Sequence, residues 1–499
     1  MQVLLLFSIF AISACGMVYE LISSTLASYL LGDSITQFST IIGVYLFAMG
    51  VGAYLCQHLQ KNLTGIFVQV ELLIGLVGGF SSTILFLLFE QVSSFRVLVY
   101  SLIGLVGCLV GLELPLLMRI LKTHFEFKKL VSKVFTFDYV GALLGSLLFP
   151  LVLVPHLGLV RSSFLFGVMN VLVAIWALNL FKQSIPWVKP LKAQAFFYLL
   201  VLLFGFVYSD QITRFTEALS YPDRVIYSKS SPYQRIVLTQ EGEDLRLFLN
   251  GNLQFSSRDE YRYHEALVHP GLSALQNPKR VLVLGGGDGL ALREILKYRS
   301  VETIQLVDLD HRVVDLFSNQ DSLKALNGDS FHNPKVHLAV ADAFEWLKTN
   351  KDPFDFVVVD FPDPSNFSIG KLYSTTFFNL LHKNVKPEGA VVIQSTSPYV
   401  ARKSFWCVAQ TLDSVDFWTR PYHLYVPSFG EWGFVLASWK PLPLPEKFPE
   451  GLKFLNAVTL RNMVNFPPDM AMVKTGVNRL DNQVLVRYFE NEWSKFLHY

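Results

Sequence analysis

Cysteine is scarce in this chain, and charged residues are scarce in its first part. Only four cysteines occur among 499 residues, and three of them, Cys15, Cys56 and Cys108, lie in long apolar segments. This pattern offers neither a disulfide framework nor a metal-ligand spacing. Residues 1–210 hold 11 Lys and Arg and 8 Asp and Glu, whereas the rest of the chain holds 31 and 32. The first part therefore has the composition of a membrane domain and the second that of a soluble one.

The soluble part also lacks a cluster of Lys and Arg interleaved with aromatic residues, and the formal net charge is only +2. We therefore expect no nucleic-acid partner. The composition is 52% hydrophobic with a mean hydropathy of +0.38, which is too apolar for an ordinary soluble protein and indicates a lipid bilayer as a partner.

Hydrophobic segments of spanning length fill the first part of the chain. They cover 3–29, 38–58, 66–88, 96–118, 135–157 and 160–181, with a shorter one at 193–208. The first segment is too long for a cleaved signal peptide and starts without a basic region. We therefore predict a polytopic domain of six to seven helices over 1–210, located in the cell membrane.

The soluble part divides again. The segment SSPYQRIVLTQEGEDLRLFLNGNLQFSS alternates apolar and polar residues around polar turns, with Asn250-Gly251 as a hairpin signal, and predicts a β subdomain over 211–275. From Arg280 strands alternate with helical stretches, which predicts a mostly parallel, doubly wound α/β domain over 276–440. Residues 441–499 are expected to form a C-terminal helical extension.

The stretch VLVLGGGDGLALREILKY, from Val281, has the pattern of a strand, a glycine turn and a helix. Such a turn lets a ligand approach bare backbone at a helix N-terminus. Asp288 within the turn would repel a pyrophosphate and attract a cation. The sequence therefore predicts a positively charged ligand on a nucleotide-binding type of fold.

Five aspartates follow predicted strand ends, namely Asp288, Asp308, Asp342, Asp360 and Asp363. Ligands of doubly wound sheets bind beyond the carboxyl ends of the strands, so these carboxylates are expected to converge. Any one of them alone is equally explained as a helix cap or a turn residue. Asp308 follows Asp288 by about 20 residues, a spacing suited to ribose hydroxyls. A nucleoside is thus favoured, with NAD, S-adenosylmethionine and its relatives all left open.

Taken together and in order, the motifs of the soluble part resemble those of the spermidine and spermine synthases, the polyamine aminopropyltransferases. The resemblance extends from about Tyr233 to Ser438 and rests on YQRI, NGNLQ, DEYRYHE, GGGDG, VDLD, ADA, DFPDP and GEWGF. The first part is similar to that of the bacterial membrane-bound branch through VYELISSTLASYLLGDS, GLELPLLMR and DYVGALLGSLLFPLVLVPHLG.

The resemblance implies a Rossmann-like, methyltransferase-type fold and a defined reaction. An aminopropyl group would pass from decarboxylated S-adenosylmethionine to an amine such as putrescine, and methylthioadenosine would be released. The donor is a co-substrate, so neither a cofactor nor a metal is expected. The partners would be these small molecules and the bilayer, and homo-oligomer formation is left open.

Roles follow from motif position in the same family. The resemblance implies Asp360 as the catalytic base, and it implies Asp363 and Tyr263 as ligands of the acceptor amine. Asp288 and His264 would bind the aminopropyl end of the donor. The nucleoside side of the donor would be bound by Gln234, Gln254, Asp308, Asp342 and Ala343.

Some positions depart from the family pattern. Pro362 stands where a small polar residue is common, Asn366-Phe367 replaces Gly-Pro, Asn250 replaces a more frequent Asp, and Asp308 replaces the usual Glu. The two acids of the DFPDP loop are intact. The identity of the acceptor amine therefore does not follow from the sequence.

Loop charges conflict with the expected location of the catalytic domain. With seven spans, nine basic residues share the side of the N-terminus, against only Arg96 and Arg161 on the other side. The positive-inside rule would then place the catalytic domain outside the cell. Because relatives of the donor are cytosolic metabolites, we expect a cytoplasmic catalytic domain instead. An interfacial position of the short segment 193–208 would give the even number of crossings that this requires.

Two other functions stay open. An S-adenosylmethionine-dependent methyltransferase would share the fold, but the acids of the glycine turn and of DFPDP fit it poorly. The other is a polyamine transporter or sensor with an attached synthase-like domain. The acidic residues in or near the apolar spans would then line a polyamine path. Otherwise they hydrogen-bond between helices or lie at the membrane interface; they are Glu20, Glu71, Glu113 and Asp138.

Overall fold

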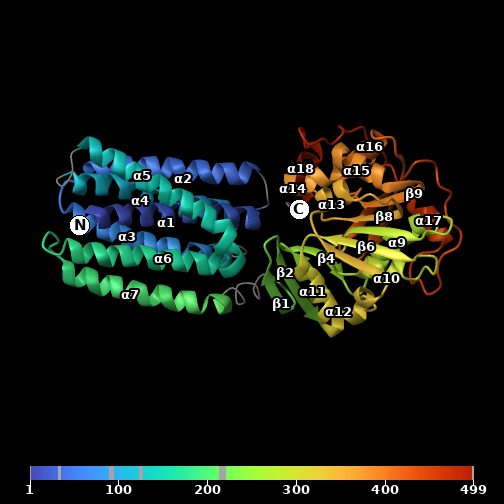
Figure 1. The fold of residues 1–499 in the computed structure, drawn as a ribbon, viewed down its shortest axis with the longest axis horizontal. Coiled ribbons are helices and arrows are strands. Elements are labelled where there is room, and N and C mark those ends of the chain that lie inside the picture. Colours follow the sequence, from blue (N-terminus) through green and yellow to red (C-terminus); the bar gives the residue numbers. More distant parts are fainter. Residues whose placement is uncertain (1, 32–34, 89–94, 123–126, 213–220, 497–499) are drawn as a thin grey trace. The chain divides into compact units, whose positions relative to one another are not determined.

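The computed structural model describes residues 2–31, 35–88, 95–122, 127–212 and 221–496. The chain divides into two compact units, Met1–Val225 and Ile226–Tyr499. Figure 1 shows that the first unit is helical and that the second combines sheets and helices. The finer domain limits expected at residues 210, 275 and 440 stay predictions.

The first unit, called the helical unit below, consists of long apolar helices. They are α1 (Gln2–Leu31), α2 (Ile35–Leu55), η1 (Cys56–His58), α3 (Leu63–Leu88), α4 (Phe95–Leu121), α5 (Phe127–Leu148), η2 (Phe149–Leu153), α6 (Val154–Leu180) and α7 (Val188–Val207). Within the described residues, six helical stretches are long and apolar enough to cross a membrane, judged by length and composition.

One of these stretches, Leu130–Leu180, is 51 residues long. It contains Gly158, whose φ of 74° and ψ of 176° interrupt the helix. Because one crossing takes about 20 residues, this stretch is long enough to cross twice. Its two parts correspond to the segments expected at 135–157 and 160–181.

Helix α7 is longer than the 16 residues expected for its apolar segment, and it packs side by side with α6 (Figure 1). Leu202 of α7 is fully buried. A Cβ added at Gly79 of α3 or at Gly167 of α6 would lie 2.5 or 3.1 Å from the Leu202 Cδ2, so glycine lets the three helices approach closely. Helix α7 is also long and apolar enough to cross a membrane. The interfacial position expected for 193–208 therefore stays a prediction, next to a seventh crossing.

The second unit, called the catalytic unit below after the expectation from its sequence motifs, begins with a four-stranded sheet in the order β1-β2-β3-β4. Its strands are β1 (Arg224–Ser230), β2 (Arg235–Glu241), β3 (Asp244–Leu249) and β4 (Asn252–Ser256). Asn250 and Gly251 connect β3 to β4 with φ of 50° and 81°, as a two-residue hairpin turn requires. The hairpin expected at this dipeptide is therefore present.

A seven-stranded sheet forms the centre of the catalytic unit, in the order β10-β11-β9-β8-β5-β6-β7. Strands β5 to β9 pair in parallel, and β10 and β11 are antiparallel. The strands are β5 (Arg280–Gly285), β6 (Thr303–Asp308), β7 (Val336–Val340), β8 (Phe354–Asp360), β9 (Val385–Gln394), β10 (Trp418–Val426) and β11 (Gly430–Ser438).

Alternate residues of the central strands feed two separate cores, because successive side chains of a strand point to opposite faces. Leu282 and Leu284 of β5 pack with helices α13 (Ala343–Thr349), α15 (Thr375–Asn384) and α16 (Arg402–Asp413). Val281 and Val283 pack with α9 (Glu260–Leu272) and α10 (Leu290–Ile295) on the other face. The expected mostly parallel, doubly wound sheet is therefore confirmed. The helices of this unit are α9 (Glu260–Leu272), α10 (Leu290–Ile295), α11 (His311–Asn319), α12 (Asp321–Leu326), η3 (Ser330–His332), α13 (Ala343–Thr349), α14 (Phe367–Gly370), η4 (Lys371–Tyr373), α15 (Thr375–Asn384), α16 (Arg402–Asp413), α17 (Ala457–Met463) and α18 (Val484–Phe496).

Candidate active site

The glycine turn and the DFPDP loop meet at the carboxyl ends of two adjacent strands, β5 and β8. Gly285 is in register with Asp360. Gly285 has a φ of 80°, and a Cβ there would lie 2.3 Å from the backbone oxygen of Asp360, so only glycine permits this approach. Crossovers leave β5 and β8 toward opposite edges of the sheet, and such a switch point is where doubly wound sheets bind ligands.

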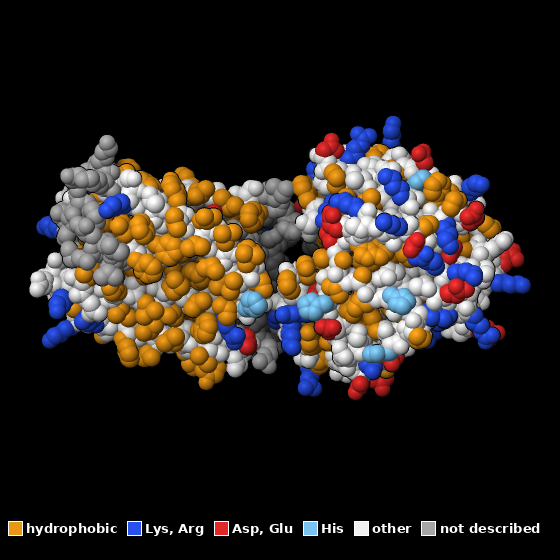
Figure 2. All heavy atoms as spheres, in the orientation of Figure 1, with side chains coloured by type: hydrophobic (Ala, Val, Ile, Leu, Met, Phe, Trp, Pro, Cys, Tyr) orange, Lys and Arg blue, Asp and Glu red, His pale blue; other side chains and the backbone are white. Residues whose placement is uncertain are grey.

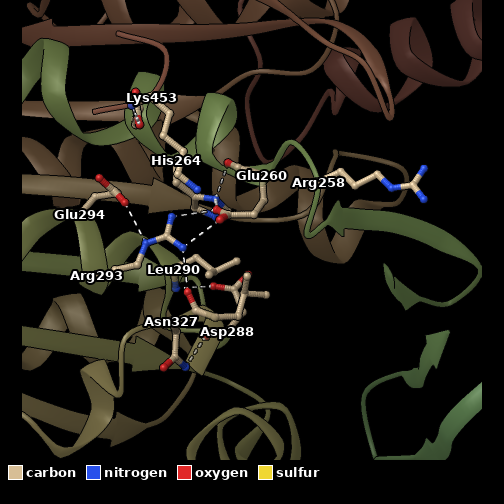
Figure 3. Close-up of polar contacts among 12 residues, drawn as sticks. Arg258, Glu260, His264, Asp288, Leu290, Arg293, Glu294, Asn327 and Lys453 are labelled. Carbon is tan, nitrogen blue, oxygen red and sulfur yellow. Dashed lines mark hydrogen bonds and ion pairs between the residues drawn. The ribbon is translucent and has the colours of Figure 1, made fainter. Parts of the chain in front are cut away.

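Asp288 lies in the glycine turn, directly before α10 (Figure 3). Its Oδ1 accepts a hydrogen bond from the Leu290 backbone N–H at 2.9 Å, and its carbonyl accepts one from the Asn327 amide at 3.0 Å. Burial raises the pKa of the Asp288 carboxyl to about 6, against the lowering effect of His264. A cationic ligand would relieve this cost by favouring the ionised form.

His264 of α9 lies among three carboxyl groups. Its Nδ1 is 2.8 Å from the Glu260 Oε2 and 2.9 Å from the Glu260 carbonyl oxygen. Burial alone would lower the pKa of His264, but Glu260, Asp288 and Asp360 together raise it to about 9. This ring therefore connects the acids of the β5 and β8 ends electrostatically.

Asp360 ends β8 and pairs with a tyrosine. The Tyr263 hydroxyl donates a hydrogen bond to the Asp360 Oδ1 at 2.6 Å. Burial raises the pKa of Asp360 above its ordinary value, and His264 and the Tyr263 hydroxyl partly oppose that rise. The Tyr263 ring packs edge-on against Phe429 and Phe434, which fixes the hydroxyl beside the carboxyl. The two predicted site residues are thus brought together.

Asp363 is positioned by two side chains that sequence reasoning missed. Its Oδ1 accepts from the Gln394 amide at 3.0 Å, and its Oδ2 accepts from the Thr396 hydroxyl at 3.2 Å. Burial raises the pKa of Asp363 to about 6, and these two hydrogen bonds oppose the rise. The available signal was Gln394, the polar residue that ends β9, together with the polar residues that follow it in the sequence. The buried Tyr373 fixes the same loop, since its hydroxyl donates to the Pro362 carbonyl at 3.1 Å.

Asp308 and Gln234 both form a hydrogen bond with Asp310. The Asp308 Oδ1 accepts from the Asp310 backbone N–H at 2.8 Å, and the Gln234 amide donates to the Asp310 Oδ2 at 3.0 Å. A Cβ at Gly287 would lie 2.7 Å from the Asp308 Oδ2, so the Asp308 carboxylate lies directly against the glycine turn. Burial raises the pKa of Asp308 to about 6.

The remaining residues predicted to bind the nucleoside are Asp342, Ala343 and Gln254, and among the described residues their hydrogen bonds do not involve the other acids of the site. Asp342 caps α13, since its Oδ1 accepts from the Phe344 backbone N–H at 2.7 Å, and its Oδ2 lies 3.0 Å from the Lys371 Nζ. The ordinary capping explanation therefore applies to Asp342, and the buried Ala343 follows it in the helix. Gln254 of β4 donates to the Asn252 carbonyl at 3.1 Å. In the described part of the chain, no hydrogen bond brings Gln254 to the acids.

Sequence reasoning also missed Glu260 and Arg293. The Glu260 carboxylate accepts from both terminal nitrogens of Arg293, at 2.8 and 2.9 Å. The signal for Glu260 was its position four residues before His264, which places both on one face of a helix. Arg293 carried no local signal, because its partner is 33 residues away.

Two acids of the helical unit are buried between helices. The Asn170 amide of α6 donates to the Glu71 Oε2 of α3 at 2.9 Å, and the Tyr19 hydroxyl of α1 donates to the Asn170 Oδ1 at 3.2 Å. Glu113 of α4 is 2% exposed. Glu71 therefore makes a hydrogen bond between helices, as one of the explanations considered for these acids expects.

Comparisons with known proteins agree with the motifs. The spermine/spermidine synthase domain profile matches residues 260–447. A spermidine synthase solved in complex with the transition-state analogue AdoDATO is 28% identical with a TM-score of 0.46, and the match covers 49% of this chain and 86% of that one.

Curated relatives match almost the entire chain. A polyamine aminopropyltransferase of Leptospira interrogans is 53% identical over 100% of both chains, and polyamine aminopropyltransferase 2 of Ralstonia nicotianae is 52% identical over 98% of both. A third relative, polyamine aminopropyltransferase 1 of Streptomyces coelicolor, is 40% identical over 99% of this chain and 95% of its own. Both the helical unit and the catalytic unit lie within these matches. The chain therefore belongs to the polyamine aminopropyltransferases.

Proposed function

We propose that the catalytic unit transfers the aminopropyl group of decarboxylated S-adenosylmethionine to an amine such as putrescine. One observation carries this proposal. Asp288, Asp360 and Asp363 gather at the ends of β5 and β8, their pKa values are raised, and no Lys or Arg within the described ranges forms an ion pair with them. Carboxyl groups of this kind are typical of functional sites, and here they suit two cationic substrates.

The donor carries a sulfonium and an ammonium group, and it lacks the carboxylate of a methyl donor. In this proposal Asp288 and His264 bind the aminopropyl end. The ribose and adenine contacts are assigned to Gln234, Gln254, Asp308, Asp342 and Ala343. The Gln234–Asp310–Asp308 hydrogen bonds support placing the ribose beside the glycine turn.

The acceptor amine must lose a proton before it can attack, since its pKa is about 10 if it resembles a lysine. Asp360 takes that proton while Tyr263 and Asp363 bind the acceptor. The nitrogen lone pair then forms a bond to the methylene carbon next to sulfur. The carbon–sulfur bond breaks, its electron pair stays on sulfur, and neutral methylthioadenosine leaves. Alignment of the two substrates supplies much of the remaining acceleration.

A product assay separates this reaction from methyl transfer. The full-length protein in detergent is incubated with decarboxylated S-adenosylmethionine and putrescine, and separately with S-adenosylmethionine and the same amine. Methylthioadenosine from the first mixture supports the proposal. S-adenosylhomocysteine from the second, without methylthioadenosine from the first, would replace it with a methyltransferase.

We also propose that the helical unit is embedded in the cell membrane. Figure 2 shows apolar side chains over most of the visible face of this unit, whereas charged side chains are spread over the catalytic unit. Large apolar residues of the helical unit are exposed, among them Phe47, Leu151 and Phe204. An exposed apolar surface of this extent is suited to lipid.

A cytoplasmic catalytic unit is the first expected outcome, because relatives of the donor are cytosolic metabolites. With six crossings and 193–208 in the interface, this orientation keeps the N-terminus and nine loop Lys and Arg in the cytoplasm as well. In intact bacteria, a C-terminal fluorescent reporter should therefore be active and a C-terminal alkaline phosphatase inactive. Active phosphatase at the C-terminus would contradict the prediction and indicate seven crossings, with the N-terminus in the cytoplasm.

The second expected outcome is that residues 213–499 fold and turn over without the helical unit. Every proposed site residue lies after Tyr233, and the catalytic unit has its own cores. Phe215 and Leu219, which could leave an apolar patch on this fragment, lie outside the described residues. A cooperative melt and methylthioadenosine release with several amines are the measurements. A folded fragment that binds donor but forms no product, while the full chain does, would show that the helical unit contributes to the site.

A further inference from the structure

His264 connects the proposed aminopropyl site to a second set of buried charges on α9 and α10 (Figure 3). The Arg293 guanidinium donates to both Glu260 oxygens at 2.8 and 2.9 Å, to the Glu294 Oε1 at 2.8 Å and to the Leu326 carbonyl at 2.8 Å. Glu260 is 3% exposed and Glu294 is 1% exposed. A bidentate Arg–carboxylate pair is geometrically specific, so Glu260 has a fixed orientation.

This orientation determines where His264 carries its proton. Burial would raise the pKa of Glu260, but hydrogen bonds from His264 and Arg293 lower it, so the group is an ionised, acceptor-only carboxylate. The Glu260 backbone carbonyl, the other group beside Nδ1, also only accepts. Nδ1 must therefore be the protonated nitrogen in the neutral ring. Nε2 is left with its lone pair.

We propose that Glu260, anchored by Arg293, is a positioning residue that fixes His264 as the Nδ1–H tautomer, so that the Nε2 lone pair accepts a hydrogen bond from the ammonium of the donor's aminopropyl arm. The inference rests on the proposed function, since that function supplies the cationic arm. It assigns a role to the ion pair between the buried Glu260 and the half-buried Arg293, since such pairs often add little net stability.

A proton balance follows from this arrangement. The charged and titratable groups around His264 are Glu260, Asp288 and Asp360, with Arg293 bound to Glu260 and Tyr263 next to the ring. Below about pH 9 the free ring carries protons on both nitrogens and repels the donor. Donor binding must then remove the Nε2 proton, whereas above that pH no proton is left to remove. Donor affinity should therefore rise with pH until about pH 9.

Calorimetry of donor binding to the full-length protein at pH 8, in buffers of different ionisation enthalpy, counts this proton. At pH 8 the carboxyl groups with pKa values of about 6 are already ionised. We expect the wild type to release about one proton per donor bound, because the His264 ring goes from charged to neutral. His264→Gln keeps an acceptor oxygen but cannot titrate, so it should release none. No release by the wild type, or unchanged release by His264→Gln, would overturn the inference.

Glu260→Gln tests the positioning role, with Glu265→Gln as its control. Glu265 is equally buried on α9, but it binds the backbone N–H groups of Lys453, Phe454 and Leu455. Glu260→Gln should move the rise of donor affinity to lower pH by at least one unit, and raise the donor KM about 10-fold at pH 9, with a smaller change in kcat. Glu265→Gln should leave the pH profile in place. A wild-type profile in Glu260→Gln would overturn the role.

The two hypotheses fail separately. The wild type could form no methylthioadenosine with any amine tested, while donor binding still releases a proton only when His264 is present. That result would reject the proposed reaction and support the proposed tautomer of His264. If Glu260→Gln does not fold, the proton count of the wild type and of His264→Gln still decides whether the donor binds to the neutral His264 ring.

Discussion

Replacing Asp360 with Asn is expected to lower kcat about 10²- to 10⁴-fold, while donor binding survives. The amide oxygen keeps the shape of the carboxyl and can still accept from the Tyr263 hydroxyl, which lies 2.6 Å from the present Oδ1. It cannot take the proton of the acceptor ammonium, so the nitrogen keeps no lone pair for attack. Methylthioadenosine release at saturating substrates gives kcat, and calorimetry gives donor binding.

The pH profile provides an independent check on the base. Asp360 acts in its ionised form, and burial raises its pKa above 3.8. Turnover at saturating substrates should therefore fall as the pH drops through that raised value, and this contribution to the pH profile should be lost in Asp360→Asn. Tyr263→Phe is the matched control, because it removes the neighbouring hydroxyl and leaves the base, and it should reduce turnover less. Wild-type turnover in a clean preparation of Asp360→Asn would remove this residue from the base role.

Replacing Asp288 with Asn should raise the donor KM about 10- to 100-fold, with a smaller effect on kcat, because hydrogen bonds to charged groups contribute about 1.5–3 kcal/mol. The variant amide keeps an oxygen for the Leu290 N–H that now donates to the Asp288 Oδ1 at 2.9 Å. The glycine turn is therefore expected to stay folded. Only the attraction for the aminopropyl ammonium is lost.

Methylthioadenosine is the control ligand for Asp288→Asn, since it has the nucleoside but no aminopropyl ammonium. Its affinity should be the same in the variant and in the wild type. An equal loss of affinity for methylthioadenosine and for the donor would mean that Asp288 acts only by shaping the turn, as a cap of the Leu290 backbone. The ratio of the two dissociation constants therefore decides between charge recognition and local folding.

Several features of the catalytic unit were predictable because they depend on neighbours along the chain. The Asn250-Gly251 turn depends on backbone freedom at two positions. The acids at the ends of β5 and β8 depend on the strand pattern before them, and parallel strands bring their carboxyl ends to one edge of the sheet. Convergence of Asp288 and Asp360 thus followed from local pattern plus one topological rule.

Other features were not predictable from local pattern. The Asp342 Oδ2 lies at Lys371 from η4, a contact between residues 29 positions apart, and its adenine role stays a prediction. The interfacial position expected for 193–208 stays a prediction, because it depends on length and hydropathy alone. The place of Leu202 between Gly79 and Gly167 depends instead on three helices from distant parts of the chain.

The sequence by itself determined the apolar helical unit, the doubly wound sheet, the family and the acids available for chemistry, because periodicity and motif order are properties of neighbouring residues. Only the tertiary structure decided which partner each acid has. Glu260 meets Arg293, Asp363 meets Gln394 and Thr396, and Asp360 meets Tyr263 across 97 residues. The physical reason is that protonation and side-chain orientation depend on burial and on the nearest charges in space, and folding brings those charges together from distant segments.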